Sequence, residues 1–123
     1  MVVGVDLIEV PRVEQAIARH GDRFLERVFT SAELFYTRGR VPELAVRFAA
    51  KEAVSKALGV GMRMLSPYGI DWREVEVLGD LRGRPAVILH GRAAEIAAGL
   101  GLREWAVSLS HTKEYAVAFV VAQ

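Results

Sequence analysis

Hydrophobic and polar residues follow two different periods along the chain, and these periods predict where helices give way to strands. Apolar residues recur every three to four positions through much of the first half, as on one face of a helix. The second half contains more two-residue alternation, which is typical of half-buried strands. The predicted helices cover residues 11–20, 22–28, 31–38, 42–58 and 92–98, and the predicted strands cover residues 2–5, 74–77, 86–89, 105–110 and 116–122.

Residues at the segment boundaries refine these limits. Thr30 and Glu33 match a capping box, in which two side chains satisfy backbone N–H groups at the start of a helix. Asp22 is expected to cap the short second helix, which runs to Val28, and Asp6 is expected to follow the end of the first strand. Residues 62–69 show no clear period and are predicted to form a loop.

The order of the predicted segments defines the fold class. Helices dominate the first half, antiparallel strands follow, and a short first strand is available to join their sheet. This order predicts an α+β fold in which an antiparallel sheet packs with helices. The chain has no internal repeat, low-complexity tract or linker, so residues 1–123 are expected to form a single domain.

Composition and charge exclude several classes of function. The chain has no cysteine, which excludes disulfides, thiolate metal sites and cysteine nucleophiles, and which fits a cytoplasmic protein. A net charge of +1 is far from the basic excess of a typical duplex-DNA binder, so no nucleic-acid partner is expected. The N-terminal sequence MVVGVDLIEV lacks the positive region of a signal peptide, and no apolar run approaches the ~20 residues of a membrane span. We therefore expect no membrane association.

The segment RFAAKEAVSK places two of the three lysines around one carboxylate, in a chain that also has thirteen arginines. On a helix, Glu52 and Lys56 share a face with Phe48, whereas Lys51 lies on the neighbouring stripe. One interpretation is a solvated Glu–Lys pair, worth about 0.2–0.5 kcal/mol. The other is functional, because this alanine-rich helix is expected to lie inside the domain and lysine is a compact charge suited to a phosphate.

Asp6 is the second candidate carboxylate. It follows a buried strand and can point out of the sheet end, but it can equally serve as a cap or first-turn acid for the helix that begins near Pro11. If Asp6 and Glu52 converge, their oxygens form the kind of cluster that holds Mg²⁺ together with water and substrate phosphates. A lysine one turn from Glu52 would then lie beside the phosphate, as is common in phosphoryl transfer.

The segment Ser108–His111 combines two serines with a histidine. A catalytic serine is disfavoured, because His111 follows directly instead of arriving from another element, and the chain has no G-x-S-x-G turn. Val107 and Leu109 are expected on one face of this strand, and the serines on the other. The serines and the histidine are then either ordinary strand polarity or hydrogen-bond partners for phosphate oxygens.

Basic residues elsewhere allow further contacts. Gly83-Arg84-Pro85 closes a turn between two predicted strands and can set a rigid backbone and a cation beside a phosphorylated ligand, although many hairpins use such a sequence. Arg12, Arg19 and Arg23 are spaced seven and four residues apart, with Gly21 between the last two. They form either a solvated face balanced by nearby glutamates or a docking surface for an acidic partner.

Four motifs, taken in order, carry a resemblance to a known family: GVD near the N-terminus, RFAAKEAVSKALG in the middle, GRP on a predicted hairpin and SLSHTKEYAVA near the C-terminus. The whole chain resembles the bacterial holo-acyl-carrier-protein synthases, the small 4′-phosphopantetheinyl transferases. The resemblance implies that family's α+β fold and its reaction. In this reaction the phosphopantetheine arm of coenzyme A moves to a serine of an apo acyl carrier protein, in fatty acid biosynthesis, and adenosine 3′,5′-bisphosphate is released.

The resemblance also implies roles for individual residues. By the family pattern, Asp6 and Glu52 bind Mg²⁺, and Lys56 meets a phosphate at the reacting centre. Members of this short class resemble homotrimers with active sites at subunit interfaces, so part of each site is expected from a neighbouring copy. The implied contacts of coenzyme A are Arg47, Gly83, Arg84, Pro85, Ser110, His111 and Thr112, and the implied contacts of the carrier protein are Arg12, Arg19 and Arg23.

Two other functions fit the same residues. An Asp with a later Glu-x-x-x-Lys loosely resembles the sites of Mg²⁺-dependent nucleases, although the near-neutral charge argues against a nuclease. A coenzyme A or nucleotide-binding module would use the same residues to hold phosphates without turnover. DNA cleavage would support the first function, and binding without transfer to any carrier protein would support the second.

Overall fold

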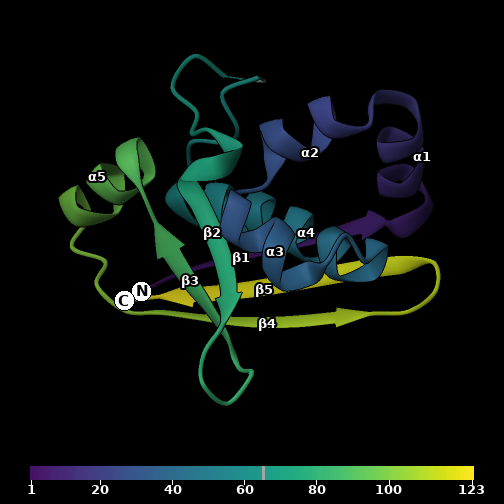
Figure 1. Ribbon diagram of the computed structural model, residues 1–123. Helices are drawn as coiled ribbons and strands as arrows, with labels where there is room; N and C mark the ends of the chain where they lie inside the picture. The colour runs from purple at the N-terminus through teal and green to yellow at the C-terminus, as the bar shows by residue number, and fades with distance from the viewer. Residues whose placement is uncertain (65) are drawn as a thin grey trace.

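The computed structural model of the protein describes residues 1–64 and 66–123 (Figure 1). Its fold is α+β, as the sequence predicts, and its strands form a three-stranded antiparallel sheet and a separate two-stranded hairpin. The helices are α1 (Val10–His20), α2 (Asp22–Val28), α3 (Ser31–Thr37), α4 (Val41–Leu58), the short 3-10 helix η1 (Trp72–Glu74) and α5 (Gly91–Gly99). The strands are β1 (Val2–Glu9), β2 (Val75–Gly79), β3 (Pro85–Leu89), β4 (Trp105–His111) and β5 (Tyr115–Ala122). Within the described ranges, no helix combines the length and the apolar composition that crossing a membrane requires.

The three-stranded sheet joins the two ends of the chain. β5 lies between β1 and β4, and both neighbours run antiparallel to it. The register places Asp6 of β1 beside Ala118 of β5, which lies beside Leu109 of β4. The first strand therefore pairs with the C-terminal strands, as the order of segments predicts.

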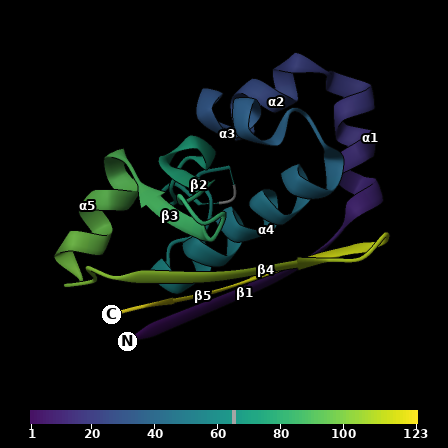
Figure 2. The same ribbon diagram turned by 60° about the horizontal axis from the view of Figure 1, so that its bottom comes forward.

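Helix α4 crosses one face of this sheet at close range (Figure 2). Gly4 of β1 packs so tightly against the helix that a Cβ at this position would overlap the carbonyl oxygen of Ala53. Most of the helix is buried, which confirms the expectation that the alanine-rich segment lies inside the protein. The helix ends at Gly59, which adopts a left-handed conformation with φ of 75°.

The two faces of the three-stranded sheet have different surroundings. Alternate residues of β5, from Ala116 to Ala122, face α4 and are buried. In Figure 2 the helices α1 to α4 all lie above the strands. The opposite face carries exposed apolar side chains on β1 and β5, namely Val3, Val5, Leu7, Tyr115 and Phe119.

The β2–β3 hairpin lies beside β4, and its turn extends past that strand in Figure 1. Strand β2 also contacts α3, which begins with the predicted capping box between Thr30 and Glu33. Of the predicted loop, residues 62–64 and 66–69 form turns between Met62 and Ile70, which pair as a single bridge. Residue 65 lies outside the described residues.

Two boundary predictions are wrong, each for a physical reason. β1 does not stop before Asp6 but continues to Glu9, because its backbone pairs with β5 along this length and the Asp6 side chain finds a charged partner on α4. Asp22 is the first residue of α2 and not its cap, because Gly21, with φ of 54°, occupies the capping position.

A third prediction fails at β2, which was expected to be half-buried. Val75 and Val77 are fully buried, and Glu76 between them is only 9% exposed. The glutamate tolerates this position because Thr30 donates a hydrogen bond to it and the His90 ring lies 3.1 Å from its carboxylate. Burial alone would raise the pKa of Glu76, but these hydrogen bonds and the charges of His90 and Lys51 lower it overall.

Candidate active site

Asp6 and Lys56 meet where β1 lies against α4. Strand alternation places Asp6 on the same face as the buried Gly4, so its side chain points toward the helix. Lys56 Nζ donates to Asp6 Oδ1 at 2.8 Å and to the carbonyl oxygen of Val5 at 3.1 Å. The lysine side chain is 55% exposed and the aspartate side chain 13% exposed, so the pair opens to solvent on the lysine side.

Glu52 lies one turn before Lys56 on the same face of α4. Partial burial raises the pKa of the Glu52 carboxyl group above its ordinary value, the negative charge of Asp6 raises it further, and Lys56 opposes both effects. The two carboxylates are thus close enough to repel each other. We call Asp6, Glu52 and Lys56 the acidic cluster.

The oxygen donors of the acidic cluster fit a hard divalent cation. Mg²⁺ is commonly bound through one or two carboxylates, with water and substrate phosphates as its remaining ligands. A cation here would also remove the repulsion that raises the pKa of Glu52. In residues 1–64 and 66–123, no group of three or more His, Cys, Asp or Glu side chains could hold a metal ion. Two carboxylates beside a lysine therefore suit a metal that shares its ligands with a phosphate.

The other two cations in the central part of α4 are engaged inside the protomer. Lys51 is fully buried, and its Nζ lies 2.7 Å from Glu33 Oε1. Arg47 is 2% exposed, donates from Nε to the carbonyl oxygen of Val77 at 2.9 Å, and pairs through Nη1 with Glu43 at 2.9 Å. A direct contact between Lys51 and a phosphate, which the sequence left open, does not fit this geometry. The implied contact of Arg47 with coenzyme A stays a prediction.

The implied coenzyme A contacts on the hairpin lie away from the acidic cluster in one protomer. Gly83, with φ of 79°, and Arg84 belong to the turn between β2 and β3. The side chain of Asp80 holds this turn by accepting a hydrogen bond from the backbone N–H of Arg84 at 2.9 Å. Because β3 lies beside β4, and β4 is the edge strand opposite β1, the turn and Asp6 lie toward opposite edges of the sheet (Figure 1).

The implied contacts near the C-terminus lie at the end of β4. Ser110 is exposed, and alternation points it to the face opposite Asp6, as the sequence predicts for the two serines of this strand. His111 is exposed at the strand end. Thr112 shapes the connection to β5, because its Oγ1 accepts a hydrogen bond from the backbone N–H of Tyr115 at 3.1 Å. A single chain therefore does not bring Ser110 to the acidic cluster.

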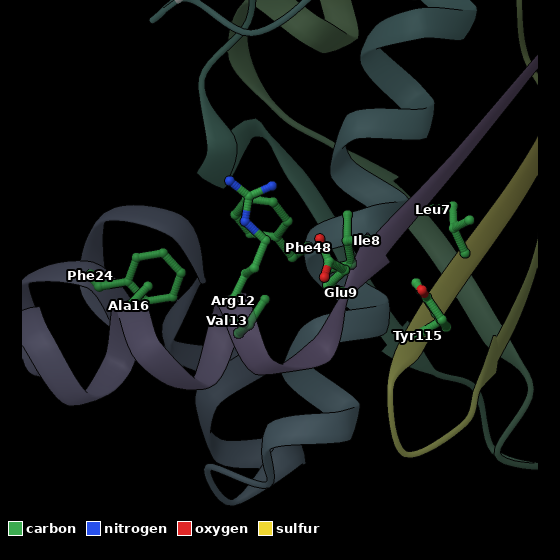
Figure 3. A pocket seen from close by; sticks show the side chains of 9 residues that line it. All are labelled: Leu7, Ile8, Glu9, Arg12, Val13, Ala16, Phe24, Phe48 and Tyr115. Carbon is green, nitrogen blue, oxygen red and sulfur yellow. The ribbon is translucent and has the colours of Figure 1, made fainter.

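The three arginines implied as partner contacts are exposed on α1 and α2. Arg12 lines a cavity of about 600 Å³, and Arg23 lines a neighbouring cavity of about 380 Å³. The two cavities share Phe24 and Phe48 as lining residues. Figure 3 shows the larger cavity with Arg12 among its side chains. Positive charge therefore borders an apolar hollow on this side of the molecule.

The larger cavity is the feature of the site that sequence reasoning missed. It adjoins the acidic cluster, because it is lined by Ile8, two residues beyond Asp6, and by Phe48, one turn before Glu52. The Phe48 ring stacks on the ring of Trp72, with the ring centroids 4.6 Å apart. One signal was available, since Phe48 shares a helix face with Glu52, but the contributions of α1, α2 and β5 to the cavity depend on tertiary packing.

Comparison with known proteins assigns the chain to a family. The family model described as the 4′-phosphopantetheinyl transferase superfamily matches residues 2–120. The chain belongs to this superfamily. The match covers nearly the whole chain and confirms the resemblance based on the four sequence motifs.

Individual relatives match the chain over nearly their full length. The chain is 50% identical to the holo-[acyl-carrier-protein] synthase of Herpetosiphon aurantiacus, with 98% of this chain and 97% of that protein covered. It is 48% identical to the enzyme of the same name from Koribacter versatilis, with 98% and 95% covered.

Solved structures agree with the fold. The holo-[acyl-carrier-protein] synthase of Helicobacter pylori in complex with coenzyme A matches with a TM-score of 0.86 at 26% identity, covering 98% of this chain and 99% of that one. The Bacillus anthracis synthase in complex with CoA (3′,5′-ADP) matches with a TM-score of 0.76 at 34% identity, covering 98% and 94%. The predicted fold class is confirmed, and the matches favour a transferase over the nuclease considered from the sequence.

Proposed function

We propose that this protein transfers the 4′-phosphopantetheine group of coenzyme A to a serine of apo acyl carrier protein and releases adenosine 3′,5′-bisphosphate. The reaction depends on Mg²⁺ and serves fatty acid biosynthesis in the cytoplasm, with residues 1–123 acting as one transferase domain. The observation that carries the proposal is the acidic cluster beside an apolar, arginine-bordered cavity, in a chain of this superfamily.

The acidic cluster supplies the electrostatic part of the reaction. Asp6 and Glu52 would hold Mg²⁺, which when bound offsets negative charge on the pyrophosphate of coenzyme A. Lys56 Nζ donates to Asp6 and to the carbonyl oxygen of Val5, and its side chain is half exposed, so it can turn from Asp6 to a phosphate oxygen on the solvent side. A cation beside Asp6 would weaken the Lys56–Asp6 attraction and favour this movement. With a bound cation and Lys56, the acidic cluster would stabilise the negative charge that develops on the phosphates.

The protein needs no nucleophile of its own, because the attacking serine belongs to the carrier protein. Alternation along β4 directs the side chains of Ser110 and His111 to opposite faces of the sheet. This geometry argues against a nucleophile paired with its base. Their proposed role is to contact the adenosine and phosphate portions of coenzyme A, together with Thr112.

The carrier protein is proposed to dock on α1 and α2. Acyl carrier proteins are acidic, and Arg12, Arg19 and Arg23 supply exposed positive charge on these helices. The chain as a whole carries a net charge of only +1, so attraction would be local and not spread over the surface. The docking position is beside the cavity of Figure 3, close to the acidic cluster where the carrier serine must react.

A homotrimer is proposed because the protomer leaves both a face and a site incomplete. Val3, Val5 and Leu7 are between 52% and 63% exposed on the uncovered face of the sheet, which favours burial against another copy. The implied coenzyme A contacts Gly83–Pro85 and Ser110 lie away from the acidic cluster of their own protomer. In a trimer these residues would contribute to a neighbour's site.

The trimer has a direct test. A molar mass from light scattering equal to three chains is expected, and a monomer or dimer would contradict the assembly. Two inactive variants, Glu52→Gln and Arg84→Glu, should regain partial activity when mixed and reassembled, because some sites would then combine an intact cluster with an intact hairpin. Failure of the mixture to recover activity, with mixed assemblies present, would contradict shared sites.

The transfer reaction is tested by intact-mass spectrometry of apo acyl carrier protein incubated with this protein, Mg²⁺ and coenzyme A. The expected result is the gain of one phosphopantetheine, which EDTA prevents. Binding of coenzyme A without any gain, with several apo carrier proteins, would instead identify a binding module.

A further inference from the structure

Strand β2 pairs with β3 along one edge, and charged side chains occupy its other edge. Lys51 of α4 donates to the carbonyl oxygen of Val75. At Val77, the backbone N–H donates to Glu33 Oε2 and the carbonyl oxygen accepts from Arg47 Nε, both at 2.9 Å. These side chains from α3 and α4 take the hydrogen-bonding positions that a neighbouring strand would fill. We call Glu33, Arg47 and Lys51 the edge clamp.

The pair at the centre of the edge clamp is closed to water. The side chains of Lys51 and Glu33 are 0% exposed, and Lys51 Nζ lies 2.7 Å from Glu33 Oε1. The ammonium group also donates to the carbonyl oxygen of Trp72 at 3.1 Å, and Glu33 Oε1 accepts from the backbone N–H of Thr30 at 3.0 Å. Burial lowers the pKa of Lys51, whereas the charge and hydrogen bond of Glu33 oppose this effect.

Such a fully satisfied pair is costly to break. Removal of one partner leaves a buried charge and buried backbone groups without hydrogen bonds. Because the edge of β2 is itself buried, water cannot replace a lost hydrogen bond to its N–H and C=O groups. The edge clamp therefore fixes where β2 lies against α4.

The edge clamp links the hairpin to the helix that carries the acidic cluster. Lys51 immediately precedes Glu52 in α4, so the buried stripe of the helix holds β2 while the neighbouring stripe carries the acidic cluster. β2 leads directly into the turn that contains Gly83–Pro85. A shift of β2 along α4 would therefore move this turn relative to Glu52 and Lys56.

We propose that Glu33 and Lys51 are positioning residues for coenzyme A, which act by holding the free edge of β2 and so fixing the hairpin turn relative to the acidic cluster. The inference rests on the proposed function, because it uses the implied contact between Gly83–Pro85 and coenzyme A. In a symmetric trimer, the same fixed relation sets how far each copy's turn reaches toward the next copy's cluster.

A second attachment keeps the hairpin in place when the edge clamp is weakened. Thr30 Oγ1 donates to Glu76 of β2, and the His90 ring lies 3.1 Å from the other oxygen of Glu76. Replacement of Lys51 is therefore expected to loosen the hairpin without unfolding the protein. This expectation makes the role of the edge clamp testable in a folded variant.

The test compares Lys51→Met with the double variant Lys51→Met/Glu33→Gln. The single variant leaves Val75 without its donor and Glu33 unpaired, whereas the double variant removes the unpaired charge but does not restore a donor to Val75. Both should raise the Kd and KM for coenzyme A about tenfold, the scale expected for an unsatisfied buried group, with the KM for carrier protein changed by less than about twofold. Amide exchange should accelerate across residues 75–89 relative to β4 and β5.

A buried truncation on β5, Val120→Ala, is the control for lost stability alone, because Val120 is fully buried in the three-stranded sheet. It should leave the KM for coenzyme A unchanged. Arg47 is left out of the test because it is also an implied coenzyme A contact.

Several results would overturn the positioning role. These are an unchanged affinity for coenzyme A in both variants, equal rises in both KM values, wild-type affinity in the double variant, or wild-type amide exchange across residues 75–89. Failure of the proposed function is distinguishable, because wild-type protein would then transfer no phosphopantetheine while the exchange measurement still tested whether the clamp holds the hairpin.

Discussion

Helix α4 contributes two lysine–carboxylate pairs on neighbouring stripes, which have similar N–O distances but differ in burial and surroundings. Lys51 lies 2.7 Å from Glu33 with both side chains fully buried, whereas Lys56 lies 2.8 Å from Asp6 with its own side chain 55% exposed. The buried pair is surrounded by backbone groups that complete its hydrogen bonds. The open pair lies beside Glu52, a carboxylate whose pKa is raised by burial and by Asp6.

The difference separates a pair that holds the fold from one that is ready to bind a ligand. A charged pair with every donor and acceptor satisfied has nothing left to offer a substrate. In the open pair, the negative charges of Asp6 and Glu52 repel each other, and a bound cation would relieve this repulsion. Unrelieved charge of this kind is common at functional sites. An ion-pair distance alone therefore does not separate the two lysines, whereas the burial of the pair and the charge beside it do.

The largest expected effect follows from removing the open carboxylate. Glu52→Gln should lower the rate of phosphopantetheine transfer about 10³-fold, because it removes a charge that would hold the metal beside the phosphates. Intact-mass spectrometry of the carrier protein measures the rate. Glu95→Gln, an exposed substitution on α5, is the matched control and should leave the rate unchanged. A Glu52→Gln variant that turns over normally would remove Glu52 from the site.

Replacing each of the two lysines in turn by methionine is expected to give opposite effects on stability and on activity. Lys51→Met should destabilise the protein by about 3–5 kcal/mol, because it leaves Glu33 charged and buried. Lys56→Met should change the free energy of unfolding by less than about 1 kcal/mol, because its pair is open to solvent. The same Lys56→Met variant should lower kcat about 100-fold, since it removes a cation from the reacting phosphates.

Urea unfolding and steady-state kinetics on the same two variants check this prediction. Large losses of stability in both variants, or an unchanged kcat in Lys56→Met, would contradict the division between a structural and a functional lysine.

The sequence predicted much of what surrounds these pairs. The capping box at Thr30 and the alanine-rich pattern of α4 gave correct elements, because both signals act over a few residues. The structure brings Asp6 and Lys56 together, and the roles of Asp6, Glu52 and Lys56 at a metal and a phosphate stay predictions. The residue types suggested a metal and phosphate site and the family resemblance implied it, but periodicity alone did not require Asp6 to approach α4.

What the sequence could not decide depends on contacts between distant segments. Lys51 and Lys56 differ in role because Glu33 lies 18 positions before Lys51, and its carboxylate is brought to Lys51 by the packing of α3. Similarly, β1 continues through Asp6 because the partner of that aspartate comes from a helix 50 positions later. Local patterns contain neither fact, since both depend on how the helices pack on the sheet and hairpin.

A smaller effect is expected at the proposed docking surface, far from the buried pair. Arg12→Glu should raise the KM for carrier protein about tenfold, with little change in the KM for coenzyme A, because it reverses a charge that faces an acidic partner. The effect should shrink at high ionic strength as exposed charges are screened. Arg103→Glu makes the same charge change on an exposed residue next to β4 and should have no such effect. Equal changes in both KM values would argue against docking at Arg12.

The smallest effect concerns the stability of the metal-free protein. Because the folded state raises the pKa of Glu52 above its ordinary value of 4.5, the folded state binds this proton more tightly than the unfolded state does. The stabilising contribution of the protonated group is present below pH 4.5 and is lost as the pH rises through the raised pKa. In EDTA, Glu52→Gln should therefore unfold at a higher temperature than the wild type at neutral pH, and the difference should vanish in acid.

Thermal unfolding of both proteins across this pH range, with and without Mg²⁺, tests the prediction through a property that does not depend on turnover. Added Mg²⁺ should stabilise the wild type by binding the folded state, and it should stabilise Glu52→Gln less. Equal stabilisation of both proteins by Mg²⁺ would show that the ion binds elsewhere. If Glu52→Gln were the less stable protein at neutral pH without metal, the open carboxylate would be supporting the fold, and the contrast with the buried Lys51–Glu33 pair would be wrong.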